Sequence, residues 1–356
     1  MHRAVFSCAV AGAVLAAALP ASADPDVRAA NAAMEAIVRK AKAPGAGIAV
    51  AYRGRLVDVQ GFGFANVATR ERVGASTMFA LASCSKPITA MAIMKLVDEG
   101  KITLATPAFA YLGMTASADP RAARITVQNL LNHSSGLPHD VPARTDDPMN
   151  TARAAARAHL LFAPGSQQAY SNAGFNVLGA IVEKASGQGY IGFVRDNVFR
   201  PAGVTRFGAL APSVQIDGQA VRYDKQGRAV TNVRANLGGT PAGGWILAPA
   251  DMVRVLVAYD AGKIVSQASR AAMLAPPAAP LKLRSNGTAF GLGWDVVYHR
   301  NGGAVFFGKN GGLNGAHTWI EHRLDGIDFA VFYNGGNGSG AHRPGLVTLE
   351  RALDGR

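Results

Sequence analysis

The stretch that decides the fold is Phe79-Ala80-Leu81-Ala82-Ser83-Cys84-Ser85-Lys86, and an apolar helix is predicted from Ser83 to Glu99. Ser83 and Lys86 are three residues apart, which places both side chains on one helix face. A serine hydroxyl is a poor nucleophile until a neighbouring base takes its proton. A lysine can serve as that base if burial or nearby positive charge lowers its pKa. The helix start favours this chemistry, because its dipole opposes a protonated amine and its free N–H groups can bind an oxyanion.

Ser-x-x-Lys alone is a permissive pattern, since a capping serine before an exposed lysine also produces it. A second segment, Tyr170-Ser171-Asn172, precedes a helix predicted over Phe175–Ala185. Tyr170 can relay a proton between Ser83 and a leaving group, while the Asn172 amide can hold Lys86 and a substrate carbonyl. The structural alternative is a tyrosine packed by its ring, with the asparagine capping the helix.

A third segment, Lys309-Asn310-Gly311-Gly312, is predicted at the edge of a C-terminal strand. Glycine there lets a substrate backbone approach closely, and a free N–H group can complete an oxyanion hole. The alternative is a hairpin turn with Lys309 as an ordinary surface cation.

In this order, the three segments resemble those of the serine β-lactamase and penicillin-binding protein superfamily, nearest class C β-lactamases, D-alanyl-D-alanine carboxypeptidases and related esterases. The resemblance spans residues 44–335. It is supported by the stretches Leu130-Leu131-Asn132-His133-Ser134-Ser135-Gly136-Leu137-Pro138 and Pro241-Ala242-Gly243-Gly244-Trp245. It implies a serine hydrolase that acts through an acyl-enzyme on an ester, a D-amino-acid peptide or a β-lactam. The alternative is a catalytically weak, penicillin-binding-like module that recognises peptidoglycan.

The resemblance also implies roles for individual residues. Ser83 would be the acylated nucleophile, with Lys86 and Tyr170 sharing the general base and acid work. Asn172 would orient them. The backbone N–H groups of Ser83 and Gly312 would form the oxyanion hole, and no metal or organic cofactor is implied.

The third segment departs from the family pattern. Lys309 would support Tyr170 electrostatically, but Asn310 stands where the resemblance favours a threonine whose hydroxyl helps to bind a substrate carboxylate. An amide can still donate a hydrogen bond, so Asn310 is predicted to orient substrate. The change puts efficient β-lactam turnover in doubt.

Strand patterns at both chain ends surround a helical middle, which predicts an α+β fold: an antiparallel sheet flanked by helices, with an inserted, mostly helical lobe. We predict one domain over 24–356, with a sheet lobe at 24–78 plus 246–356 and a helical lobe at 79–245. The expected helices are Asp26–Lys42, Thr126–Leu131 with Thr126 as its cap, Thr151–Leu161, Phe175–Ala185 and Tyr190–Phe199. The expected strands are Gly47–Tyr52, Leu56–Val59, Phe290–Val297, Thr318–Glu321 and Ile327–Tyr333.

Residues 1–23 have the pattern of a cleaved signal peptide: Arg3, an apolar run from Ala4 to Leu19, and Ala21-Ser22-Ala23. The run is shorter than the roughly 20 strongly apolar residues of a membrane-spanning helix. We therefore expect export to the periplasm or medium and no transmembrane segment in the mature form.

The formal charge of +13 favours anionic partners, but the basic residues are scattered without a nucleic-acid motif. We expect a small-molecule or peptidoglycan-derived substrate and no nucleic acid. Cys84 is expected to be a small packed side chain. His133, His317 and His322 lack metal-ligand spacing and are expected to have loop or surface roles.

Overall fold

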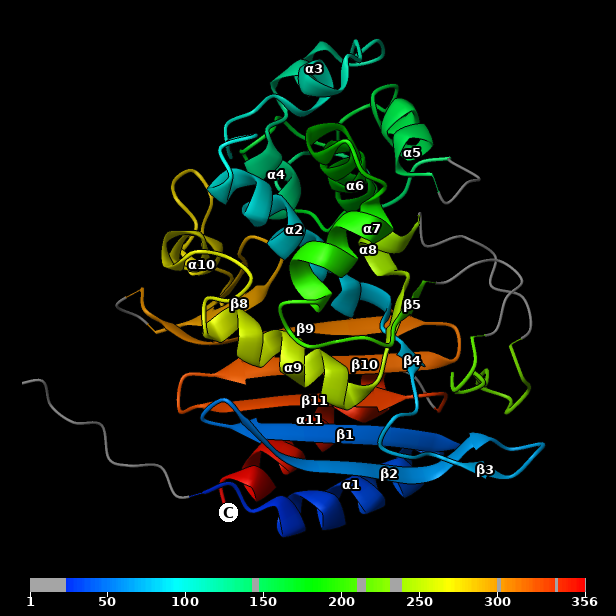
Figure 1. Cartoon of the computed structure of the whole chain (residues 1–356). Coiled ribbons are helices and arrows are strands. Elements are labelled where there is room, and N and C mark those ends of the chain that lie inside the picture. Colours follow the sequence, from blue (N-terminus) through cyan, green and yellow to red (C-terminus); the bar gives the residue numbers. More distant parts are fainter. Residues whose placement is uncertain are drawn as a thin grey trace, which may run out of the picture.

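The computed structural model describes residues 24–142, 147–209, 216–230, 239–299, 302–336 and 339–355 (Figure 1). Its helical elements are α1 Val27–Ala41, η1 Ala82–Ser85, α2 Lys86–Asp98, α3 Ala108–Leu112, η2 Pro120–Arg124, α4 Val127–Leu131, α5 Pro148–Ala155, α6 Asn172–Ser186, α7 Tyr190–Val194, η3 Arg195–Phe199, α8 Thr240–Gly243, α9 Pro249–Asp260, α10 Gln267–Leu274 and α11 Ser339–Leu353. Its strands are β1 Gly45–Tyr52, β2 Arg55–Asn66, β3 Glu71–Arg72, β4 Phe79–Ala80, β5 Gly208–Ala209, β6 Trp245–Leu247, β7 Thr288–Phe290, β8 Asp295–Tyr298, β9 Ala304–Leu313, β10 Ala316–Arg323 and β11 Ile327–Tyr333. The predicted signal peptide lies outside the described residues.

The main sheet joins the two ends of the chain, as the sequence predicts. It has eight strands in the order β3-β2-β1-β11-β10-β9-β8-β7. β1 pairs antiparallel with β11, with Ile48 opposite Val331, so a strand near residue 50 adjoins one near residue 330. The expected α+β fold is confirmed, and β4, β6 and β5 form a separate three-stranded sheet.

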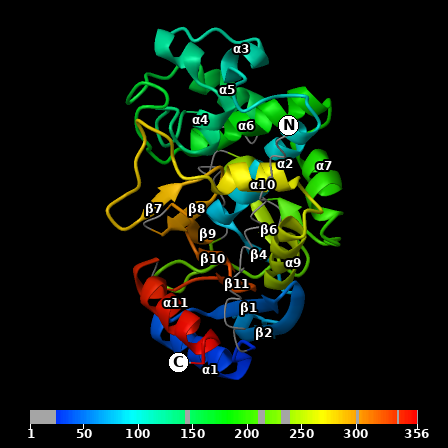
Figure 2. The same ribbon diagram turned by 90° about the vertical axis from the view of Figure 1, so that its left-hand side faces the viewer.

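Alternation along β1 explains how the sheet supports helices on both faces. Ile48 and Val50 belong to a core shared with α1 and α11, whereas Ala49 and Ala51 belong to the larger core on the opposite side. Successive strand side chains point to opposite faces, so a central strand covered twice is buried throughout. Figure 2 shows α1 and α11 on one side of the sheet and the other helices on the opposite side.

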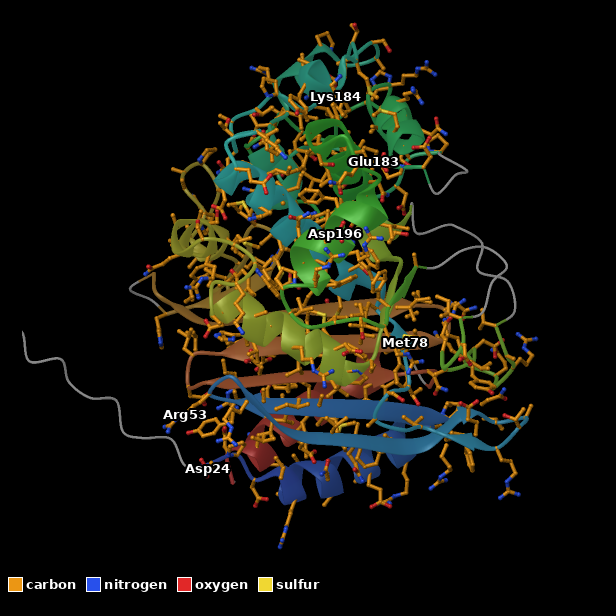
Figure 3. All side chains as sticks on the ribbon, viewed as in Figure 1. Asp24, Arg53, Met78, Glu183, Lys184 and Asp196 are labelled. Atoms are coloured by element: carbon orange, nitrogen blue, oxygen red, sulfur yellow. The ribbon has the colours of Figure 1, made fainter. Side chains whose placement is uncertain are left out.

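The helices above the sheet surround α2. Most of its residues are buried, and it is apolar on nearly all sides, as expected for a helix inside a core rather than on a surface. In Figure 3, Glu183 and Lys184 of α6 lie in this helical layer, while Arg53 marks the β1–β2 turn of the sheet. Among the described residues, no helix is both long and apolar enough to cross a membrane.

Several predicted elements are confirmed and others differ in extent, such as the strand predicted over Leu56–Val59, which is β2 Arg55–Asn66. Thr126 caps α4 by accepting a hydrogen bond from the Asn129 N–H at 3.2 Å, as expected. The helix predicted over Thr151–Leu161 is α5 Pro148–Ala155, and it does not reach Leu161 because the Leu160 N–H donates to Asp119 Oδ2 at 3.0 Å. The strand predicted over Phe290–Val297 is a hairpin of β7 and β8, which turns through Gly293 at φ +87°.

Candidate active site

The nucleophile candidate lies at a sharp turn between a strand and a buried helix. β4 pairs with β6, and the Leu81 N–H donates to the Trp245 carbonyl at 2.8 Å. Ala82 then adopts φ +48°, a conformation that costs an ordinary L-residue about 1–2 kcal/mol. The chain next turns into η1 and α2, which leaves the Ser83 side chain partly exposed.

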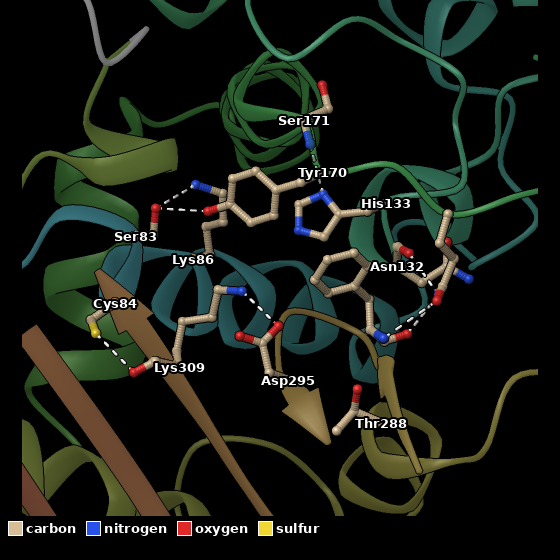
Figure 4. A network of polar contacts seen from close by, with 12 residues as sticks. Ser83, Cys84, Lys86, Asn132, His133, Tyr170, Ser171, Thr288, Asp295 and Lys309 are labelled. Carbon is tan, nitrogen blue, oxygen red and sulfur yellow. Dashed lines mark hydrogen bonds and ion pairs between the residues drawn. The ribbon is translucent and has the colours of Figure 1, made fainter. Parts of the chain in front are cut away.

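The central spatial prediction is confirmed, because hydroxyl, amine and phenol meet (Figure 4). Tyr170 Oη donates to Ser83 Oγ at 2.7 Å, and Lys86 Nζ lies 3.3 Å from the same oxygen. Tyr170 comes from the segment before α6, whereas Ser83 and Lys86 come from the junction of η1 and α2. Ser83 Oγ is thus held between two groups that can exchange protons with it.

The environment of Lys86 favours a neutral amine. The side chain is fully buried, and Nζ lies 2.8 Å from Asn172 Oδ1 and 2.6 Å from the Ala242 carbonyl. Burial, followed by the positive charge of Lys309, lowers the pKa of Lys86 well below its usual value. A neutral amine has two N–H groups and one lone pair. The two carbonyl oxygens can take the N–H groups, which leaves the lone pair for the Ser83 proton.

Tyr170 is held as a neutral phenol by its surroundings. Burial raises its pKa, and the hydrogen bond with Ser83 opposes that rise only in part. Its ring packs on His133, with centroids 4.4 Å apart, and on Phe290 at 5.9 Å. A neutral phenol keeps the proton that a leaving group needs.

Lys309 is a second buried lysine, but it has a carboxylate partner. Its Nζ lies 2.8 Å from Asp295 Oδ1 and 4.9 Å from the centre of the Tyr170 ring. Asn310 is exposed and lies opposite Trp319, which packs toward α1 and α11. Because neighbouring strand residues point to opposite faces, the Asn310 side chain does not share the face of Lys309. The structure therefore brings Lys309 to the site but does not bring the Asn310 amide there.

Gly311 shows why a glycine follows in this segment. A Cβ atom there would lie 2.4 Å from the Leu81 carbonyl oxygen and 3.0 Å from the Ser83 nitrogen. Only a residue without a side chain lets β9 lie this close to the nucleophile turn.

Gly312 is the next residue of the same strand. Pairing of β9 with β8 ends at Gly308, opposite Asp295, and in the described part of the chain no strand pairs with that edge further along. Such an edge presents backbone N–H groups at alternate residues. The Gly312 N–H therefore stays a predicted partner of the Ser83 N–H in the oxyanion hole.

Three residues of the site were not predicted as site residues from the sequence. Asp295 is the partner of Lys309, and Ala242 contributes only its backbone carbonyl to Lys86. His133 is in a loop as expected but is buried, not on the surface; burial, followed by the charges of Lys309 and Lys86, lowers its pKa. Ala242 and His133 both lie in stretches that support the family resemblance, which was the only available pointer to them.

Two other predictions concern residues near or outside the site. His322 was expected to have a loop or surface role, and this is wrong. It is buried in β10, and its Nδ1 lies 2.6 Å from Asp328 Oδ1. Cys84 is fully buried as expected, and burial raises the pKa of its thiol to about 12. It is therefore a packing residue and not a competing nucleophile.

Comparison with known proteins identifies relatives over most of the chain. The family model described as Beta-lactamase matches residues 30–349. The chain is 27% identical to penicillin-binding protein 4* of Bacillus subtilis over 300 residues, covering 74% of this chain and 62% of that protein. It is 25% identical to protein flp of Staphylococcus aureus over 214 residues, covering 58% of this chain and 43% of that protein. The chain thus spans less than two thirds of the length of these relatives.

A solved structure supports the same relationship. The octameric penicillin-binding protein homologue from Pyrococcus abyssi superimposes with a TM-score of 0.76 at 27% identity, covering 92% of this chain and 79% of that one.

Proposed function

Because the chain belongs to the beta-lactamase family, within the serine β-lactamase and penicillin-binding protein superfamily, we propose that it hydrolyses acyl compounds through a covalent intermediate on Ser83. The observation that carries the proposal is the position of Ser83 Oγ, 2.7 Å from the Tyr170 phenol and 3.3 Å from the Lys86 amine. A hydroxyl held between a neutral base and a neutral acid is the arrangement that covalent acyl transfer requires.

In the proposed acylation step, Lys86 takes the Ser83 proton while Oγ forms a bond to the substrate carbonyl carbon. The carbonyl oxygen becomes an oxyanion, which the N–H groups of Ser83 and Gly312 bind. Tyr170 then gives its proton to the leaving group as the bond to carbon breaks, and it is reprotonated from Lys86. A water molecule then attacks the acyl-enzyme, with the proton transfers in the reverse order. This releases the acid and regenerates Ser83.

The substrates that we propose are esters and D-amino-acid peptides or amides, including peptidoglycan-derived ones. β-Lactams are the least favoured of the three predicted classes. The residue after Lys309 is an asparagine, and its side chain lies on the opposite face of β9 from the Lys309 amine. It therefore does not supply the hydroxyl that the family pattern uses for a substrate carboxylate.

We further propose that the protein is exported after removal of residues 1–23. This proposal rests on the arginine, apolar and small-residue pattern at the start of the chain. N-terminal sequencing of protein recovered outside the cytoplasm tests it. A mature chain beginning at Asp24 is expected, and a chain that still begins at Met1 would contradict it.

A labelling experiment tests the catalytic proposal. Purified protein is treated with a fluorophosphonate, and the modified peptide is mapped by mass spectrometry. We expect one adduct on Ser83, its loss in Ser83→Ala, and its retention in the neighbouring control Cys84→Ser.

Turnover of p-nitrophenyl esters, D-alanyl-D-alanine peptides and nitrocefin then ranks the substrate classes. A protein that binds peptidoglycan fragments but is neither labelled nor active on any of these compounds would be a binding module, and the catalytic proposal would be wrong.

A further inference from the structure

Asp140 has no role in the steps above, yet hydrogen bonds connect it to the proposed base. Its Oδ1 accepts from Asn172 Nδ2 at 3.1 Å, and Asn172 Oδ1 lies 2.8 Å from Lys86 Nζ. On the other side, Asp140 Oδ2 lies 2.5 Å from His139 Nδ1. A continuous chain of polar contacts thus runs from the exposed His139 and Asp140 to the buried amine.

The middle member of this chain, Asn172, is an amide and has two possible orientations. In the observed one, the oxygen faces Lys86 and the nitrogen faces Asp140. In the reversed one, the amide oxygen would face a carboxylate oxygen, and neither group could donate. An ionised carboxylate only accepts hydrogen bonds, so Asp140 selects the observed orientation.

The orientation matters because Lys86 has a single lone pair when neutral. A reversed amide would point an N–H group at Lys86, and the lone pair would then accept from Asn172 instead of from Ser83. With the oxygen toward Lys86, Asn172 accepts one amine hydrogen and leaves the lone pair for the Ser83 proton.

Backbone contacts hold Asp140 at this place even though its side chain is 48% exposed. The carbonyl of the preceding residue, His139, accepts from the N–H groups of Asn172 at 2.8 Å and Ala173 at 3.2 Å. These are the first residues of α6, so the segment that carries Asp140 is fixed to the helix that carries Asn172.

We propose that Asp140 is a positioning residue that fixes the Asn172 amide so that Lys86 remains available as the base for Ser83. This inference rests on the proposed function of Ser83 and extends it to a residue outside the motifs. Asp140 need not touch the reacting atoms, because it acts through Asn172.

The test compares Asp140→Asn with the exchange variant Asp140→Asn/Asn172→Asp. The single variant has two amides that can both reverse, and its rate of fluorophosphonate labelling is expected to fall about 10- to 100-fold, part of what a general base contributes. In the exchange variant, an acceptor-only carboxylate faces Lys86 and the new amide at 140 donates to it. Labelling should recover at alkaline pH, because a carboxylate beside Lys86 raises the pKa of the amine.

The pH profile separates positioning from simple damage to the fold. The charge of Asp140 raises the pKa of Lys86. In a plot of labelling rate against pH, the acid limb of Asp140→Asn should therefore move to lower pH, and the plateau rate should fall. A purely structural defect would lower the thermal midpoint, leave the limb in place and not be repaired by Asn172→Asp. Labelling of Asp140→Asn within twofold of the wild-type rate, with an unchanged limb, would overturn the inference.

A second measurement is independent of activity. The Asn172 Nδ2 hydrogens should exchange slowly in NMR spectra of the wild-type protein and faster in Asp140→Asn, since they lose an obligate acceptor. Equal exchange in both proteins would overturn the inference even if Ser83 is labelled. Absence of labelling in the wild-type protein would instead count against the proposed function.

Discussion

Lys86 and Lys309 are two buried lysines close to one tyrosine, and they differ in the charge of their partners. Their Nζ atoms lie 4.7 and 4.9 Å from the centre of the Tyr170 ring. The oxygens beside Lys86 belong to an amide, a backbone carbonyl and a hydroxyl, whereas Lys309 contacts the Asp295 carboxylate at 2.8 Å.

The difference teaches how one residue type can serve two purposes in one site. Burial without a counter-charge disfavours the ammonium form, so Lys86 is poised to accept a proton. Lys309 lies within hydrogen-bonding distance of the Asp295 carboxylate, and its positive charge lowers the pKa of Lys86. The roles follow from the partners and not from the depth of burial.

The largest expected effect is the difference in kcat between two variants in which one of the lysines is replaced by arginine. Arginine keeps the charge but does not act as a base near neutral pH. Lys86→Arg should lower kcat for an ester substrate by about 10³- to 10⁴-fold. Lys309→Arg keeps the cation and should lose only about tenfold. Steady-state kinetics measures kcat for both variants. Similar losses of kcat would contradict the different roles assigned to the two lysines.

The second effect is a dependence of the free energy of unfolding on pH. The pKa of Lys86 is lower in the folded chain than in the unfolded chain, so between these values the unfolded state binds more protons. Stability should therefore rise with pH across that window, by at most about 1.4 kcal/mol per pH unit for one proton.

Urea unfolding of wild type and Lys86→Met between pH 7 and 8.5 measures this contribution. Both proteins contain Cys84 and the same tyrosines, so the titration of thiol and phenol groups cancels in the comparison. We expect the stability difference between the two proteins to change with pH in favour of wild type as the pH rises. A difference that stays constant would mean that Lys86 is charged in the folded state.

A smaller effect tests the coupling between the lysines. Removing the positive charge in Lys309→Met should raise the pKa of Lys86 and move the acid limb of kcat/KM to higher pH, by up to about one unit. The variant Lys309→Gln also removes the charge but keeps a hydrogen-bond donor, so it provides the control for polarity. A limb that moves to lower pH in either variant would contradict the assigned sign.

The smallest effect has the opposite sign. The charge of Asp295 raises the pKa of Lys86 and is a weaker influence than Lys309, so Asp295→Asn should move the acid limb to lower pH by a few tenths of a unit. Asp98→Asn, which alters a carboxylate bonded to Ser266 and Ser269, should leave the limb unchanged. Equal shifts in both variants would indicate a nonspecific charge effect.

The sequence allowed the reacting residues of the site to be predicted better than the residues that contact and position them. Ser83, Lys86, Tyr170 and Asn172 could be named because each lies in a short pattern with a chemical reason for its residue types. Asp295 could not, since it pairs with Lys309 only through the antiparallel pairing of β8 and β9. Ala242 could not either, because a backbone carbonyl has no signature in the side-chain sequence.

In the fold, too, features set by local sequence were predictable and features set by distant contacts were not. The union of β1 and β11 was predictable from strands at both chain ends, while element limits set by distant contacts were not. The helix ending at Ala155 is one example, because Asp119 takes up the Leu160 N–H from 41 residues away. The Asn310 side chain is another, since its face depends on the strand register opposite Trp319.

The protonation state of Lys86 is the most direct test of the account. Heteronuclear NMR of ¹³C- and ¹⁵N-labelled lysine, with Lys86→Arg for assignment, reports the pH at which this amine loses its proton. The account predicts that Lys86 does so at lower pH than the other lysines and is neutral where the enzyme is active. An Lys86 amine that stays protonated throughout the active pH range would contradict it.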